Sequence, residues 1–146
     1  MLRSILYLSL IASTPLIAIC ASLPMISKVD ALPSALFVTI PKSQPRPELE
    51  IFAEFAPSDG WWLRIEVKNF AFTELCVSKA NATALGHAHV HLGLQKIATA
   101  YHPDVFIGHL PAGSHQITVS LRAQDHRVLA SPSGGMFSKS LTLQIP

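Results

Sequence analysis

Alternating apolar and polar residues dominate the chain from Ala35 onward, and this period of two predicts β-strands. In the stretch from Glu48 to Phe55, four apolar residues alternate with three glutamates and one phenylalanine. A second alternating stretch runs from Trp61 to Asn69, and the Pro57-Ser58-Asp59-Gly60 sequence between the two is a strong turn signal. These two stretches therefore predict a β-hairpin.

Shorter segments of the same kind follow along the rest of the chain. We expect them to form strands at residues 35–40, 86–92, 96–101, 105–107, 116–122 and 136–145. The Gly93-Leu94 pair fits a type II′ turn between two of them, whereas residues 70–85 have no clear period and predict a long loop. Seven or eight short strands with frequent turns predict an all-β fold, an antiparallel sandwich that is Ig-like or cupredoxin-like.

The N-terminus has the layout of a secretory signal peptide. Arg3 precedes an apolar run from Ile5 to Ile19, and small residues follow at 20–22, where a signal peptidase can cut. The run is shorter than the ~20 residues that a membrane span requires. We therefore expect a signal peptide at 1–22, an N-terminal segment with a first strand at 23–47, a β-sandwich domain at 48–146, and a periplasmic or secreted location. A cut after Ala31 and lipidation of Cys20 are the alternatives.

Charge and cysteine usage narrow the function classes. The charged fraction is 14% and the net charge is +2, with scattered lysines and arginines, which excludes a nucleic-acid surface. After cleavage Cys76 is the single cysteine, so the mature chain has no internal disulfide. The Cys76 thiol is either a soft metal ligand or, as is commoner for a free cysteine, a small buried hydrophobe.

All seven histidines lie between His87 and His126, and three of them form the run Gly86-His87-Ala88-His89-Val90-His91. On a strand, alternate side chains share a face, so these three imidazoles project to one side. Neighbours on that face are ~6.5–7 Å apart at Cα, which lets two rings reach one metal ion. The run therefore predicts a metal site on a strand.

The stretch from Gly60 to Pro146 resembles a loose group of exported bacterial domains of uncharacterised function. The likeness rests on the Gly86-His87-Ala88-His89 strand, the Leu110-Pro111-Ala112-Gly113 turn into an amphipathic strand, and Asp125-His126. This resemblance implies an Ig-like sandwich whose histidines ligate copper or zinc. It also implies that His91 is peripheral, because many relatives have an aromatic residue at that position.

His87 and His89 are the strongest ligand candidates, with His126 as the third because it lies at the end of a strand. Asp125 is the residue before His126. The alternative role for its carboxylate is to accept a hydrogen bond from an imidazole and so fix the orientation of the ring. Three other histidines are expected to have roles other than metal binding. His115 is expected to be hydrogen-bonded to backbone near a turn, and His102 and His109 to be solvated.

These residues predict an exported metal-binding domain that holds a copper or zinc ion through His87, His89, His126 and His91. Its partners are the ion and another periplasmic protein, with no nucleic acid and no membrane span in the mature chain. The alternative is an Ig-like structural or interaction module without metal. We expect no enzyme. The sequence His89-Val90-His91 is similar to one in copper-zinc superoxide dismutases, but this chain has no counterpart of that family's zinc loop.

With a reference histidine pKa near ~6.5, metal affinity is expected to fall as pH drops through roughly 6.

Overall fold

The computed structural model describes residues 32–74 and 84–146, and these residues form an all-β fold. The strands are β1 (Phe37–Thr39), β2 (Glu48–Ala56), β3 (Gly60–Lys68), β4 (Ala71–Phe72), β5 (Leu85–Leu92), β6 (Gln95–Ala100), β7 (Asp104–Gly108), β8 (Gly113–Ala123), β9 (Val128–Ala130) and β10 (Ser138–Ile145). The expected number of seven or eight strands was too low. The additional strands β4 and β9 have two and three residues, too few to leave a period in the sequence.

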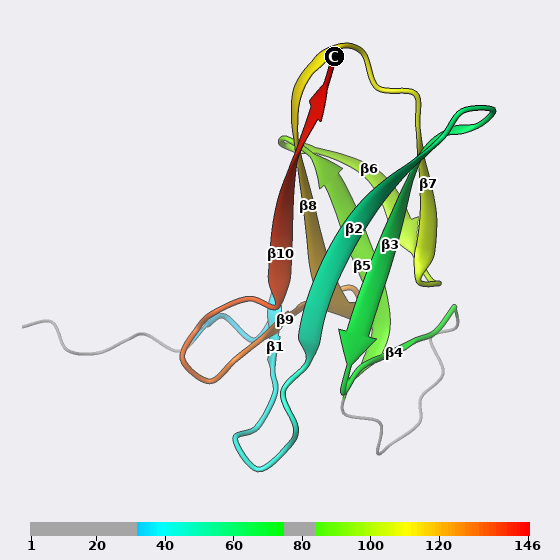
Figure 1. The fold of residues 1–146 in the computed structure, drawn as a ribbon. Coiled ribbons are helices and arrows are strands. Elements are labelled where there is room, and N and C mark those ends of the chain that lie inside the picture. The colour runs from blue at the N-terminus through cyan, green and yellow to red at the C-terminus, as the bar shows by residue number, and fades with distance from the viewer. Residues whose placement is uncertain (1–31, 75–83) are drawn as a thin grey trace, which may run out of the picture.

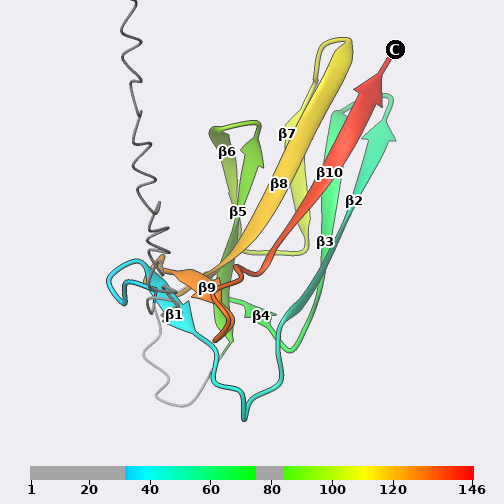
Figure 2. The same cartoon turned by 90° about the vertical axis from the view of Figure 1, so that its left-hand side faces the viewer.

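The strands form two sheets that pack against each other (Figures 1 and 2). One sheet has three strands in the order β2-β3-β7. The other is curled and has seven strands, with β5 and β8 at its centre, β10 and β9 on one side of β8, and β6 and β4 on one side of β5. Two short pairs, β1 with β9 and β4 with β5, are parallel, so the expectation of a wholly antiparallel fold was wrong there. No tight turn links either pair, so antiparallel pairing is not imposed on them.

The predicted hairpin is confirmed in position and register. β2 and β3 pair along their whole length, with Ile51 opposite Ile65 and Ala53 opposite Leu63. Those four residues face the second sheet and are buried or half-buried. The hairpin of β5 and β6 also has the expected two-residue turn, in which Gly93 has the positive φ of 57° that the first position requires.

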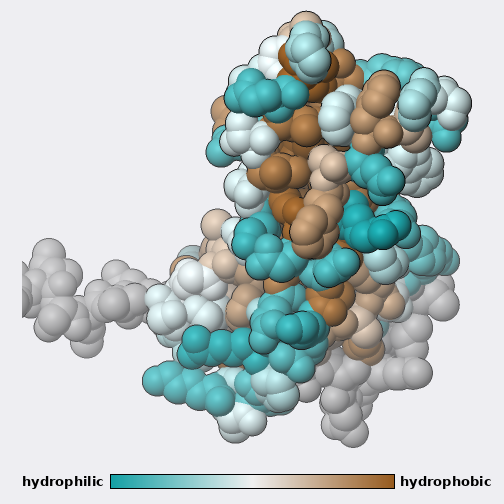
Figure 3. All heavy atoms as spheres, viewed as in Figure 1, coloured by the Kyte–Doolittle hydropathy of each residue, from teal (hydrophilic) through white to brown (hydrophobic). Residues whose placement is uncertain are grey.

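The core lies between the two sheets. It is made of the inward-facing aliphatic residues, which include Leu63 and Ile65 from the small sheet and Val90, Ile117, Val119 and Leu121 from the large one. Figure 3 shows a band of apolar residues between β10 and β2. Leu141 and Leu143 on β10 and Leu49 on β2 pack against this core. The Lys139–Glu50 ion pair at 2.7 Å joins the same two strands.

β5 and β8 pair closely because residue 86 is a glycine. A Cβ at Gly86 would collide with the carbonyl oxygen of Arg122, so no larger residue fits there. In this antiparallel pair, Ala88 lies opposite Leu121 and faces the core. The alternate residues, including His87 and His89, therefore face away from the three-stranded sheet.

Several expectations concern residues outside the described ranges. The signal peptide at 1–22, the lipidation alternative at Cys20, the later cut after Ala31, and Cys76 all lie there. Within residues 32–74 and 84–146, no helix has the length and apolar character needed to span a membrane.

Candidate metal centre

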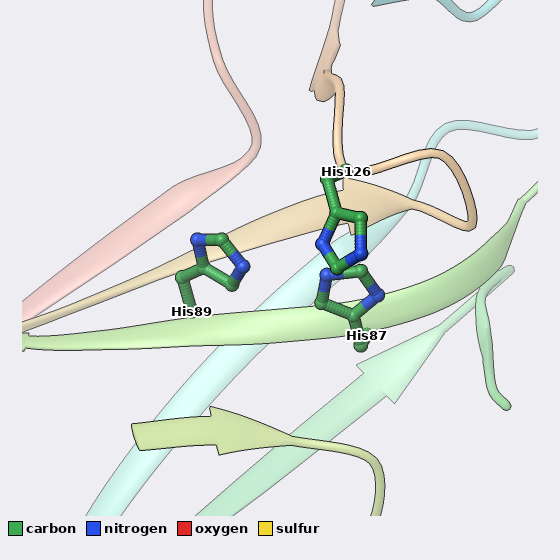
Figure 4. A group of neighbouring side chains, drawn as sticks. All are labelled: His87, His89 and His126. Carbon is green, nitrogen blue, oxygen red and sulfur yellow. The ribbon is translucent and has the colours of Figure 1, made fainter. Parts of the chain in front are cut away.

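β5 places His87 and His89 next to each other on one face of the large sheet (Figure 4). Their ring centroids are 5.1 Å apart, as expected of alternate residues on one strand. The opposite face of the strand carries Ala88 and Val90, both fully buried in the core. Because this apolar face fixes the rotation of the strand, the two imidazoles cannot turn away from their common side.

His126 comes to the same place from the hairpin that joins β8 to β9. In this turn the His126 amide donates to the Ala123 carbonyl at 3.0 Å, and the Ala123 amide donates to Arg127 at 2.9 Å. His126 itself has a φ of 69°, the left-handed conformation that closes a three-residue loop. Glycine usually fills that position, so a histidine there carries a backbone cost. Such a cost is typical of a residue whose side chain has a role.

The carboxylate of Asp125 braces this turn and does not orient an imidazole. Its two oxygens accept hydrogen bonds from the backbone amide of Arg127 at 3.1 Å and from the Arg127 guanidinium at 2.8 Å. The Arg127 guanidinium also donates to the carbonyl of Ser34, just before β1, at 2.9 Å. The alternative in which Asp125 holds an imidazole was therefore wrong, because the carboxylate bonds to Arg127 and to no histidine of the described residues.

The three histidines converge. One ring nitrogen from each of His87, His89 and His126 lies within 4.8 Å of the others. At Zn–N or Cu–N bonds of ~2.0–2.1 Å, nitrogens around one ion lie ~3.3–3.6 Å apart, so side-chain adjustments of about 1 Å suffice. The rings of His87 and His126 are closest, with centroids 4.5 Å apart and planes inclined by 61°, and Figure 4 shows them next to each other.

The centre is sheltered from solvent on the His87 side. Only 2% of the surface of His87 is exposed, and its ring is close to those of His126 and Tyr101, with centroids 4.5 Å and 5.4 Å away. His89 is half-buried and His126 is exposed. The site is thus built on a buried strand and opens at the hairpin.

Burial keeps two of the imidazoles neutral. Desolvation lowers the pKa of His87 to about 4, and the nearby positive charges of His126, Arg122 and Lys96 add to the effect. Desolvation also lowers the pKa of His89 to about 4, with further contributions from Arg122 and Lys96. A neutral imidazole has the free lone pair that a metal ion needs, so both residues are ready to bind at neutral pH.

Four buried polar atoms of this cluster have no hydrogen-bond partner among the described residues. They are His87 Nε2, His89 Nε2, Ser120 Oγ and Arg122 Nε. Leaving a buried donor or acceptor unpaired costs about 1–3 kcal/mol each, so native proteins rarely tolerate several together. A bound ligand that uses these atoms removes the cost.

The structure leaves His91 outside the converging group. Its ring centroid is 6.3 Å from that of His89, and His91 does not belong to the group whose ring nitrogens lie within 4.8 Å of one another. His115 donates from Nε2 to the Pro111 carbonyl at 2.8 Å, which confirms its expected backbone role. His102 lies 2.7 Å from the carboxylate of Glu74 at the surface, and His109 is exposed.

Sequence reasoning missed the non-histidine residues of the cluster. In the β5–β8 pair, Arg122 lies directly opposite His87 and Ser120 directly opposite His89, so all four share one face. In the alternating sequence of the strand expected at 116–122, Ser120 and Arg122 fall on the polar, outward face. This outward position was the only signal in the sequence. The pairing of β5 with β8, which sets the two residues beside the histidines, joins segments far apart in the chain and could not be predicted from local patterns.

No protein-family model, curated protein or solved structure matches the chain.

Proposed function

We propose that this protein is an exported metal-binding domain that holds a copper or zinc ion through His87, His89 and His126. The convergence of three ring nitrogens within 4.8 Å carries the proposal. Two further features support it. The ligands on β5 are neutral at physiological pH because they are buried, and their Nε2 atoms have no partner in the described part of the chain.

The donor set selects the class of metal. Three imidazole nitrogens suit Zn(II) and Cu(II), whereas Ca(II) and Mg(II) prefer oxygen ligands and Cu(I) prefers sulfur. Because three protein ligands leave one position of a tetrahedral ion open, the site resembles an exchange or reactive site more than a closed structural one. Handling of the ion, rather than permanent storage, is the role we assign to it.

The location and the fold family belong to the same proposal. Arg3, the apolar run and the small residues at 20–22 support export to the periplasm or secretion. The two packed sheets support a β-sandwich of the Ig-like or cupredoxin-like kind, with the metal held by a strand and an adjacent hairpin.

Calorimetric titration of the purified protein with Cu(II) and Zn(II) tests the proposal. We expect stoichiometric binding at micromolar Kd or tighter. The double variant His87→Ala/His89→Ala should lose it, and the matched control His102→Ala/His109→Ala should keep it, because those histidines lie outside the cluster. His91→Ala should change the affinity by about twofold at most. Absence of binding by the wild-type protein, or equal loss in the control, would rule the site out.

A second candidate is an Ig-like interaction module, and one observation favours it. Trp62 and Phe106 form a tilted aromatic pair with centroids 5.3 Å apart on the outer face of the three-stranded sheet. Their exposed fractions are 38% and 48%, and Phe52 on the same face is 51% exposed. Exposed aromatic residues are typical of protein contact surfaces. If Cu(II) and Zn(II) do not bind while Trp62→Ala abolishes self-association or partner binding, this second function is the correct one.

A further inference from the structure

Arg122 and Ser120 extend the histidine cluster along β8. Each lies directly across the antiparallel pair from a ligand candidate, Arg122 from His87 and Ser120 from His89. Cross-strand partners of this kind have Cβ atoms about 4.5–5.5 Å apart on the same face. The guanidinium and the hydroxyl thus border the position where an ion would be held.

The charge at this place is unbalanced. The converging ligand group, among the described residues, consists of three histidines without a carboxylate. The nearest acid in sequence, Asp125, is paired with Arg127 at 2.7 Å. A divalent ion bound by neutral imidazoles beside Arg122 would therefore gather about three positive charges in a partly buried site, which is unfavourable without an anion.

One buried polar atom in each of these two side chains lacks a hydrogen-bond partner. Arg122 Nε and Ser120 Oγ are buried, and neither makes a hydrogen bond within residues 32–74 and 84–146. Ser120 is 7% exposed. A guanidinium and a hydroxyl are both hydrogen-bond donors, and an arginine binds small oxyanions through its planar fork. Their free donors point to an anionic ligand.

We propose that the ion in this centre takes a small monoanion as its fourth ligand, held from the protein side by Arg122 and Ser120. This inference rests on the proposed metal site and adds to it the class of exogenous ligand. The anion is expected to be small, because Arg122 and Ser120 lie across from His87 and His89 on the buried side of the site, where His87 is 2% exposed. A carboxylate or an inorganic monoanion has the required size and charge.

Azide titration of the Cu(II)-loaded protein provides the test, since azide bound to Cu(II) produces a charge-transfer absorption. We expect a saturable band in the wild-type protein. Arg122→Gln should weaken azide binding by at least about tenfold, because a charge-assisted hydrogen bond is lost. The matched control Arg64→Gln removes an arginine from the other sheet and should leave azide binding unchanged.

A second variant covers the case in which Arg122→Gln does not fold. Ser120→Ala removes one oxygen and creates no clash, and it should weaken azide binding by about fivefold. Both variants should retain Cu(II), and Arg122→Gln should bind it at least as tightly as wild type because a positive charge has gone.

The outcomes separate the two proposals. Failure of the wild-type protein to bind Cu(II) would overturn the metal site itself. Binding of Cu(II) without an azide band, or with equal azide affinity in wild type, Arg122→Gln and Ser120→Ala, would overturn the anion site alone.

Discussion

Gly86 and Arg122 lie against each other so closely that a methyl group on residue 86 would collide with the arginine's carbonyl oxygen. The contact lies one residue before His87, at the point where β5 and β8 set the positions of the whole cluster. The glycine of the Gly-His pair is therefore a packing requirement of the site and not only of the strand.

Gly86→Ala should push β5 away from β8 and lower the free energy of unfolding by about 3 kcal/mol, at the upper end of the cost of overpacking. Metal affinity should fall with it, because His87 and Arg122 separate. Urea denaturation and calorimetry measure the two effects. Gly135→Ala is the control, since a Cβ there meets Ser131 Oγ at an ordinary 3.4 Å. A Gly86→Ala protein as stable as wild type would show that the strands are not in this register.

Replacing His126 by glycine should make the metal-free protein more stable and destroy the site. Glycine adopts a φ of 69° without the penalty of a side chain, so the free energy of unfolding should rise by about 1 kcal/mol. Loss of one of three ligands should weaken metal binding by at least about 100-fold. The experiment compares thermal melting without metal and titration with Cu(II) or Zn(II).

His126→Asn is the matched control for that variant, because asparagine also tolerates the left-handed conformation but has no imidazole. It should lose the metal without a large gain in stability. The assignment of His126 fails if either variant binds the ion with wild-type affinity.

Asp125 is expected to act as a positioning residue for His126. Asp125→Ala removes the ion pair with Arg127, which is solvent-exposed and therefore contributes little to stability. Metal affinity should still fall by roughly threefold to tenfold, because the turn that carries His126 is looser. Asp104→Ala breaks a similarly exposed pair with Arg64 on the other sheet and should leave the affinity unchanged. Equal effects of the two variants would argue against a positioning role.

Acid should destabilise the metal-free protein between about pH 6.5 and 4. In this window the unfolded chain protonates His87 and His89, whose folded-state pKa values burial has lowered to about 4. The unfolded state then binds more protons, so the free energy of unfolding falls with falling pH, and the loss levels off below pH 4. It should amount to about 1–2 kcal/mol for each ring after allowance for solvent access.

Urea denaturation at pH 7 and pH 4.5 measures this loss. The difference in the free energy of unfolding between the two pH values should be smaller in His87→Ala/His89→Ala. The lowered pKa values also revise the sequence-based pH expectation for metal binding. Protons compete for these two ligands only as the pH approaches about 4, so metal should still raise the melting temperature at pH 5. Loss of that stabilisation already at pH 6 would contradict this revised expectation.

Local patterns in the sequence predicted more of this molecule than long-range pairing did. The β2–β3 hairpin and the strand with His87 and His89 follow from alternation and turn residues within a few positions of each other. The placement of Arg122 opposite His87 depends on pairing between segments that no turn connects, so no local rule predicts it. His91 shows the reverse error. Alternation grouped it with His89, but the third histidine, His126, comes from the hairpin after β8 and lies beside His87, so the group of converging nitrogens does not include His91.

The parallel pairing of β1 with β9 sets the order in which the chain can fold. Phe37 pairs with Val128, and the Ser34 carbonyl accepts a hydrogen bond from Arg127. β1 can therefore pair only after residues far along the chain have taken their places. Contacts of such long sequence separation slow folding, because a large loop must close before they form. The turn with His126 is held to the segment before β1 by the hydrogen bond from Arg127 to Ser34. The turn that carries His126 is therefore tied to the rest of the fold by a contact between residues 93 positions apart in the chain.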